Sequence, residues 1–216
     1  MKANFKLLES DAEISKRISK QIAGSLNSAV MGAVPTISSR IKSLVRNAIV
    51  SSPEYISLLG GTLQGELGVP SSGERLSRIL DIWLKSMQIS RKPIRSVGSR
   101  ISGGITVTMI RDDYGDVLGT VEASYTTLKG RNIPWLEWLL IAGDKTLVAD
   151  YIFTEDISTG ISRTGLGLMR QKNTGRWHVP REFAGTATNN FVTRSLSRLE
   201  GEVIAIMQKE VAKRLK

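Results

Sequence analysis

The side chains that most often carry out catalysis are scarce in this chain. Its 216 residues include no cysteine and one histidine, His178. The lack of cysteine excludes thiol nucleophiles, disulfides, iron–sulfur clusters and zinc sites built on thiolates. A Ser-His-Asp triad would depend on His178, and no Gly-x-Ser-x-Gly motif is present to supply the serine. We therefore expect His178 to be an ordinary loop or strand residue.

Carboxylates are the remaining groups that could hold a metal ion. A magnesium-dependent nuclease would need a cluster of acids near strand ends. The acids grouped in that way are Asp144, Asp150, Glu155 and Asp156. Asp112, Asp113 and Asp116 have a spacing loosely like that of calcium ligands, but the loop is short and lacks the closing glutamate. Turn formation explains this second group better, and we predict no catalytic residue, no metal site and no cofactor.

The chain is strongly basic, with 30 Lys and Arg, 20 Asp and Glu, and a net charge of +10. Such an excess favours nucleic acid, an anionic membrane or an acidic protein as partner. The basic residues are scattered without a block of Lys and Arg alone, which argues against a dedicated DNA-binding tail. No apolar run reaches the roughly 18–20 residues that cross a bilayer, and residues 1–8 lack the apolar core of a signal peptide. We expect a protein assembled in a cytoplasm, without a membrane partner.

The most distinctive segment covers residues 162–180. It has four cations and no acid between residues 163 and 176. In a nucleic-acid interpretation the cations follow phosphates and the neighbouring tryptophan stacks on a base. In the interpretation that we favour, the segment is a hairpin with a solvated face that can contact another protein. The candidate interface residues here are Arg163, Arg170, Lys172, Arg176 and Trp177.

Two helices are expected in the first quarter of the chain. Ser10 and Glu13 have the spacing of a capping box, and Pro35 is expected to break or kink the helix that follows. An apolar face over residues 37–48 predicts the second helix, which Pro53 ends. In the first helix apolar residues recur at every fourth position, so their stripe winds obliquely, as it would across a neighbouring subunit. These candidate interface residues are Ile14, Ile18, Ile22 and Leu26.

Helices and short strands are expected to alternate after residue 53. The glycine-punctuated stretch 57–68 holds at most a short helix, and Ser71 with Glu74 has the spacing of a capping box for a core-facing helix. Alternating apolar residues predict a hairpin between 105–109 and 117–125, followed by a short apolar helix that starts at Pro134.

A strand over residues 146–154 and a second hairpin, turning at 173–175, are predicted next. Asn189 or Asn190 caps a long C-terminal helix. The residues expected in the core are Trp83, Trp135, Trp138, Leu139, Tyr151 and Phe153.

The fold class is therefore α+β, with N-terminal helices, an antiparallel sheet of four to five short strands and a long C-terminal helix. Residues 1–52 are expected to form an N-terminal helical segment, and residues 53–216 an α+β core domain.

Several short motifs between residues 133 and 216 carry a resemblance to a known family. They are Pro134-Trp135-Leu136-Glu137-Trp138-Leu139, Arg163-Thr164-Gly165, Trp177-x-Val179-Pro180, Phe183-Ala184-Gly185-Thr186 and Asn189-Asn190-Phe191-Val192-Thr193-Arg194. Weaker agreement comes from Ser52-Pro53-Glu54-Tyr55, Leu58, Gly60-Gly61 and Glu66-Leu67-Gly68. Together they resemble the neck and tail-completion proteins of tailed bacteriophages.

This resemblance implies a structural virion protein and no chemistry. Such a protein forms a cyclic homo-oligomer of six or twelve copies in the virion neck. It joins the portal to the tail beside portal, adaptor, stopper or tail proteins. DNA passes through its lumen without sequence-specific contact. Because a basic lumen would hold phosphates and slow DNA, we expect the excess charge to lie on outer or inter-ring faces.

Three alternatives stay open. The first is a sequence-independent nucleic-acid-binding protein, which the charge favours although no helix-turn-helix, RNA-recognition motif or zinc finger is present. The second is a phage tail terminator. The third is a phage-encoded enzyme such as a nuclease.

Overall fold

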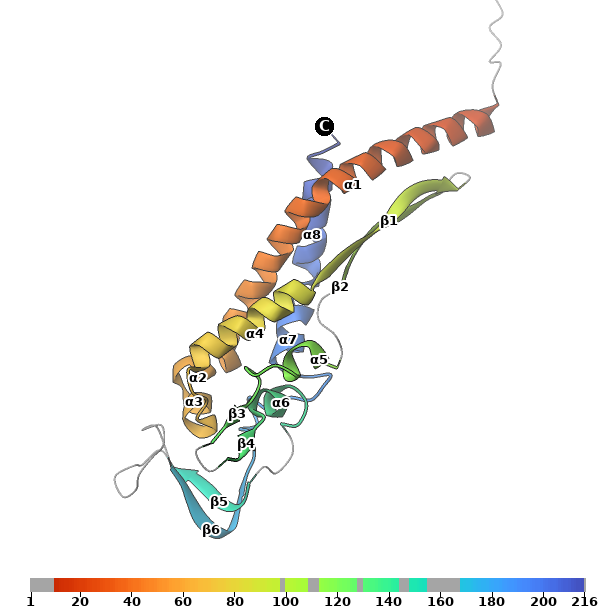
Figure 1. The fold of residues 1–216 in the computed structure, drawn as a ribbon. Helices are drawn as coiled ribbons and strands as arrows, with labels where there is room; N and C mark the ends of the chain where they lie inside the picture. The colour runs from red at the N-terminus through yellow and green to blue at the C-terminus, as the bar shows by residue number, and fades with distance from the viewer. Residues whose placement is uncertain are drawn as a thin grey trace, which may run out of the picture. The chain divides into compact units, whose positions relative to one another are not determined.

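The computed structural model describes residues 10–97, 100–108, 113–127, 130–143, 148–154 and 168–215, and it describes residues 148–154 and 168–177 by their backbone alone. The α+β class is confirmed, and the chain is mostly helical (Figure 1). Internal contacts divide the chain into two units. Unit 1 is Met1–Ile41, Gln88–Thr108 and Gly201–Lys216, and unit 2 is Lys42–Met87 and Met109–Glu200. The predicted boundary between residues 52 and 53 stays a prediction.

Helix α1 (Asp11–Val50) begins at the predicted capping box. The Ser10 amide and hydroxyl both donate to a Glu13 carboxylate oxygen at 3.0 Å, and the Glu13 amide donates to the Ser10 hydroxyl at 3.3 Å. The bonds from Ser10, the backbone one first, lower the pKa of Glu13 because they favour its charged form. The capping box is confirmed.

Of the break or kink predicted at Pro35, the break into two helices is wrong, because the 40-residue helix α1 includes Pro35 and continues to Val50. An internal proline costs about 3 kcal/mol, but burying one large aliphatic side chain contributes about 1.5–3 kcal/mol. Pro35 itself is exposed, and the buried stripe runs past it on another face. The stripe consists of Ala29, Ala33, Ile37, Ile41, Val45 and Ile49.

Strands β1 (Gln88–Val97) and β2 (Arg100–Thr108) form a two-stranded antiparallel ribbon in unit 1. The predicted pairing of 105–109 with 117–125 is wrong, since part of the second segment is the short helix α5 (Gly115–Leu118). The true partner is β1, whose charged residues and internal proline hide the alternation that identifies a strand.

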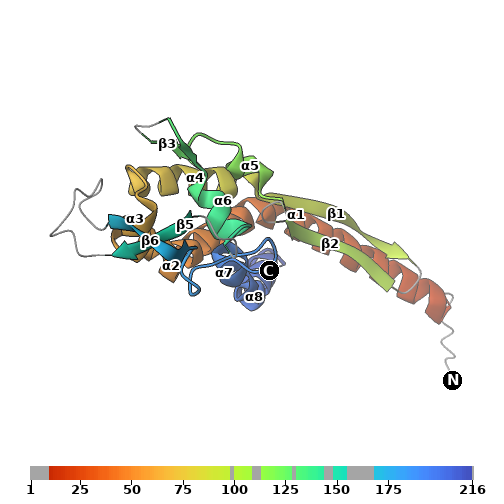
Figure 2. The same cartoon turned by 90° about the horizontal axis from the view of Figure 1, so that it is seen from below.

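A β-bulge ties this ribbon to α1. The register shifts between Lys92 and Arg95, so that Pro93 and Ile94 both lie opposite Gly103. The amide of Ile94 is thereby free to donate to the Asn27 side-chain oxygen of α1 at 3.2 Å. Figures 1 and 2 both show the ribbon running beside the first half of α1.

We predict that Gly103→Ala opens the ribbon. Gly103 has φ +125°, and a Cβ there would lie 2.6 Å from the Pro93 carbonyl oxygen. Backbone strain and overpacking together cost about 2–4 kcal/mol. Amide hydrogen exchange should show loss of protection in β1 and β2. Gly104→Ala is the matched control, because φ is +149° but no atom lies within 4 Å of its Cβ. Equal loss of protection in both variants would contradict the close approach at Gly103.

Helix α8 (Glu200–Ala212) packs on α1 within unit 1. The buried Glu210 carboxylate accepts from Lys213 at 2.9 Å and pairs with Arg40 of α1 at 3.2 Å. The hydrogen bond from Lys213, and then the charge of Arg40, lower the pKa of Glu210.

The prediction of a single long C-terminal helix is wrong, because α7 (Phe191–Ser197) ends before α8 begins. A turn closed by the Leu199 amide on the Leu196 carbonyl separates the two helices.

Unit 2 begins with three helices, α2 (Pro53–Gly60), α3 (Thr62–Leu67) and α4 (Ser72–Ser86). The stretch 57–68 thus belongs to two short helices rather than to one at most. The capping box predicted at Ser71 is wrong, because Ser71 has φ +50° and its side chain does not bond to the helix. The core-facing pattern of α4 is confirmed, since Leu76, Ile79, Leu80, Trp83 and Leu84 are all buried.

The apolar helix α6 (Trp135–Leu140) starts directly after Pro134, as predicted. Trp83, Trp135 and Leu139 are buried, which confirms their place in the core, whereas Trp138 is half-buried. Trp83 meets Phe191 of α7 edge to face at 6.1 Å between ring centroids. The predicted burial of Tyr151 and Phe153 lies outside the described side chains.

The strands of the described chain form three separate antiparallel pairs, so the single sheet of four to five strands is wrong. Beside β1–β2 these are the two-residue strands β3 (Tyr125–Thr126) and β4 (Asn132–Ile133), and the longer β5 (Val148–Thr154) and β6 (Leu168–Trp177). The turn predicted at 173–175 is also wrong, since these residues lie inside β6, opposite a register shift between Ala149 and Tyr151. A bulge uses the same residue types as a turn, because both need backbone that leaves the regular strand.

None of the helices in the described chain is long and apolar enough to span a membrane.

Candidate functional site

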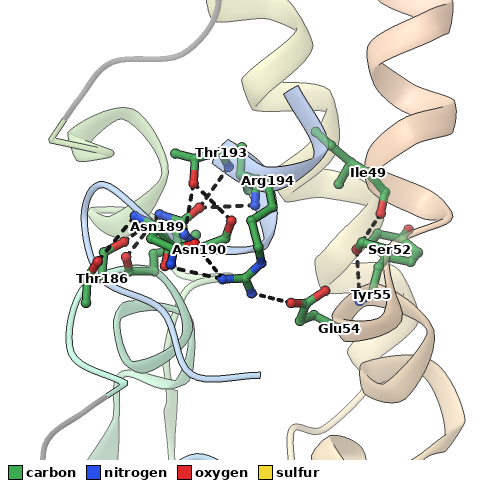
Figure 3. Close-up of polar contacts among 11 residues, drawn as sticks. Ile49, Ser52, Glu54, Tyr55, Thr186, Asn189, Asn190, Thr193 and Arg194 are labelled. Atoms are coloured by element: carbon green, nitrogen blue, oxygen red, sulfur yellow. Dashed lines mark hydrogen bonds and ion pairs between the residues drawn. The ribbon is translucent and has the colours of Figure 1, made fainter. Parts of the chain in front are cut away.

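The best-defined polar arrangement of unit 2 joins the start of α7 to α2 and α6 (Figure 3). Asn190 is its central residue and is fully buried. Its side-chain oxygen accepts from the amides of Val192 at 3.0 Å and Thr193 at 3.1 Å, which caps α7. The Asn190 amide in turn donates to the Thr193 hydroxyl at 2.8 Å. The alternative left open by the sequence is thus resolved in favour of Asn190.

The side-chain amide of Asn190 connects α7 to two other parts of unit 2. It donates to the Leu140 carbonyl of α6 at 3.1 Å, the Thr186 carbonyl at 2.9 Å and the Tyr114 hydroxyl at 2.7 Å. These acceptors come from segments 50 and 76 residues away as well as from the preceding loop. One buried side chain therefore provides hydrogen-bond partners for a carbonyl group at the end of α6 and for two amide groups at the start of α7.

An ion pair connects α7 to α2. Arg194 donates to the carboxylate of Glu54, a residue that is only 4% exposed. Arg194 also donates to the side-chain oxygen of Asn189 at 3.0 Å. Ser52 caps α2 by accepting from the Tyr55 amide at 3.2 Å. The carboxylate of Glu54 has a positive partner, as a buried charge requires.

Two glycines allow the loop before α7 to approach α6. The Gly143 amide donates to the Gly185 carbonyl at 3.0 Å. A Cβ on Gly185 would lie 2.1 Å from the Leu139 carbonyl oxygen, and one on Gly143 would lie 2.5 Å from the Gly185 amide. No side chain fits at either position, so both glycines are needed for this packing.

The motifs that carry the resemblance therefore largely supply the contacts that hold the helices and loops of unit 2 together. Tyr125 makes another such contact, between β3 and α3. Its hydroxyl donates to the Leu67 carbonyl at 2.6 Å, beside Gly68, whose left-handed backbone ends α3. Val179 of the Trp-x-Val-Pro motif is fully buried. The motif Arg163-Thr164-Gly165 lies outside the described residues. The described residues of these motifs thus have structural roles in unit 2. They supply no reactive group.

The predicted stripe on α1 is only partly covered by the chain itself. Ile18 is 54% and Ile22 45% exposed, whereas Ile14 and Leu26 are half-buried. Ala23 and Val30 are buried instead, because the stripe winds away from the covered face. The role of Ile14, Ile18, Ile22 and Leu26 as an interface stays a prediction.

The second predicted interface lies on β6 and the residues before it. Arg170, Arg176 and Trp177 are in β6, opposite Ile152, Ala149 and Val148 of β5. Lys172 is also in β6. Their side chains, and the whole of Arg163, lie outside the described part of the chain, so this interface stays a prediction as well.

No metal site emerges among the described residues, which contain no group of three His, Asp or Glu side chains able to hold an ion. Asp113 accepts from the Gly115 amide at 3.0 Å, which is turn chemistry as predicted. Asp112, Asp144, Glu155 and Asp156 and the side chain of Asp150 lie outside the description. The exposed His178 has its Nδ1 atom 2.7 Å from the neighbouring Val179 carbonyl oxygen.

The net charge is distributed unequally between the two units. Unit 1 contains 14 Lys and Arg and 5 Asp and Glu, a net +9, whereas unit 2 contains 16 and 15, a net +1. The excess of positive charge thus belongs almost entirely to unit 1, because unit 2 contains 15 of the 20 Asp and Glu. The exposed cations of its ribbon are Arg91, Lys92, Arg95 and Arg100.

Sequence reasoning missed the four ribbon cations because it missed β1. One signal could have found them, since residues 82–111 contain six Lys and Arg and no Asp or Glu.

Comparisons with protein-family models, with curated proteins and with solved structures give no match for this chain.

Proposed function

We propose that this chain is a structural protein of a tailed-phage virion, forming a cyclic ring in the neck that joins the portal to the tail and lets DNA pass. The observation that carries the proposal is the buried joint around Asn190. Residues from three of the motifs that resemble neck and tail-completion proteins are in contact there. Asn190 donates to the Thr186 carbonyl, and Arg194 pairs with Glu54, which is 140 residues away in sequence. Proteins that share a fold are expected to share the residues that make such buried contacts.

Two further features support a structural role in an assembly. Unit 2 has a well-packed core and a nearly balanced charge, which suits a subunit body. Helix α1 leaves Ile18 and Ile22 exposed at a spacing of four residues, so that one helix face is available to a neighbouring subunit. A heterologous contact of this kind closes into a ring when its rotation permits.

The test is the copy number of the chain in the virion and the state of particles that lack it. We expect six or twelve copies per virion by quantitative mass spectrometry, with six favoured because tails are six-fold. Deleting the coding sequence should leave full heads and free tails that do not join, as seen by electron microscopy. Wild-type complementation should restore joining, and Arg163→Ala with Arg170→Ala should restore it poorly. Joined particles in the deletion, or a copy number that is no multiple of six, would contradict the proposal.

The alternative of a tail terminator predicts a different defect. Tails would then be of irregular length in the deletion, whereas a neck ring leaves their length unchanged. The same micrographs separate the two.

A further inference from the structure

We infer that the β1–β2 ribbon, defined by Gln88–Val97 and Arg100–Thr108, is a binding surface for the phosphate backbone of double-stranded DNA. The inference goes beyond the proposed neck function and does not depend on it, because DNA binding by the purified chain needs no virion. It rests on the charge, the side-chain types, the dimensions and the anchoring of the ribbon.

The ribbon is entirely free of negative charge. Residues 88–108 contain four cations and no Asp or Glu, and all four cations are exposed. Unit 1 as a whole has a net charge of +9, and Lys16 and Lys20 are exposed on the half of α1 beside the ribbon. A second copy of unit 1 would be repelled by this surface, whereas a polyanion is attracted to it.

One face of the ribbon bears groups that donate hydrogen bonds to phosphate. Antiparallel partners share a face, so Gln88, Ser90 and Lys92 lie on the same side as Thr108 and Thr106. Amide, hydroxyl and ammonium groups of this kind are the usual phosphate donors in protein–DNA contacts. Lys92 is opposite Gly104, where there is open space and no side chain to keep the backbone of a ligand away.

The ribbon lacks the features of the two competing partners. It contains no Trp, Tyr, Phe, Met or His. Single-stranded nucleic acid is held largely by stacking on aromatic rings. Protein interfaces use aromatic, Met and Arg anchors, and of these the ribbon has only Arg. The exposed Val97 and Ile101 near the turn are too few to replace them.

The dimensions also fit a duplex. Ten residues at about 3.3 Å each span about 33 Å, close to one turn of DNA at about 34 Å. The major groove admits a two-stranded ribbon. The bulge at Pro93 and Ile94, with its bond to Asn27, fixes the ribbon on α1 and lowers the entropy lost on binding.

The expected binding is weak and strongly dependent on salt. The four ribbon cations can make up to four phosphate contacts, which give a slope of up to about −3.6 in log K against log salt, so that affinity falls by up to about 150-fold from 50 to 200 mM. Such a contact releases DNA readily at physiological ionic strength. It is therefore compatible with DNA movement through a neck.

The experiment is fluorescence anisotropy of a labelled 30-base-pair duplex with the full-length chain. The ribbon variant replaces Arg91, Lys92, Arg95 and Arg100 with Gln. The control variant makes the same charge change in unit 2, replacing the exposed Lys85, Arg131, Arg181 and Arg198 with Gln. We expect the ribbon variant to bind at least 10-fold more weakly at 50 mM salt and to lose most of the slope, and the control to stay within about three-fold of wild type.

Unchanged thermal melting of both variants shows that the fold is intact. Equal weakening in the two variants would mean a general charge effect and overturn the inference, as would a wild-type chain that does not bind the duplex. Labelled poly-glutamate is the third probe. If it binds as tightly as the duplex and depends equally on the ribbon cations, the surface belongs to an acidic protein and not to DNA. The two proposals are tested independently. A chain that does not bind DNA could still be present in six or twelve copies per virion, and a copy number that is no multiple of six would not alter the result for DNA binding.

Discussion

Trp135→Ala is expected to lower the free energy of unfolding by about 3–5 kcal/mol, the usual cost of removing a large buried aromatic side chain. Trp135 is fully buried in α6, and its indole N–H donates to the Glu122 carbonyl at 3.0 Å. The stability of a whole domain is only about 5–15 kcal/mol. Urea unfolding followed by circular dichroism at 222 nm should show a large fall in the midpoint.

Two variants separate the causes of this effect. Trp135→Phe keeps most of the ring and loses the hydrogen bond, and Arg75 still donates to the Glu122 carbonyl at 3.2 Å. We therefore expect a loss of only about 1–2 kcal/mol. Trp138 is half-buried on the same helix, so that Trp138→Ala should cost clearly less than Trp135→Ala. Equal costs at positions 135 and 138 would mean that α6 presents another face to the core.

Asn190→Ala is expected to lower the free energy of unfolding by a similar amount, about 3–5 kcal/mol. Here the loss comes from broken hydrogen bonds and not from a cavity in the core. It removes the cap of α7, which alone contributes about 0.5–2 kcal/mol. It also leaves the Leu140 carbonyl without the donor that lies 3.1 Å away and deprives the Thr186 carbonyl of one donor. A buried group that loses its partner costs about 1–3 kcal/mol.

The controls for this prediction are Asn189→Ala and Asn190→Asp. Asn189 is exposed and its side chain contacts Arg194, so its loss should cost less than about 1 kcal/mol. Asn190→Asp keeps the oxygen that caps α7 but presents oxygen to the Leu140 and Thr186 carbonyls, and should be almost as unstable as the alanine variant. Urea midpoints for the four proteins provide the measurement. A stable Asp variant would show that the cap is the only contribution of Asn190.

Local patterns in the sequence determined those elements whose stability depends on neighbours in the chain. The capping box at Ser10, the buried face of α4 and the apolar helix after Pro134 were all predicted, because spacing along one helix identifies both the cap and the face. The α+β class and the burial of Trp83, Trp135 and Leu139 followed from the same patterns.

Tertiary packing decided the rest. Pro35 stays inside a helix because buried residues on both sides of it outweigh its local cost. Strand β2 pairs with β1 rather than with a later segment, since pairing is a choice between partners that alternation within one strand cannot make. Asn190 rather than Asn189 caps α7 because its amide reaches acceptors up to 76 residues away. The same holds for net charge, because three distant segments that contain few acids fold together into unit 1.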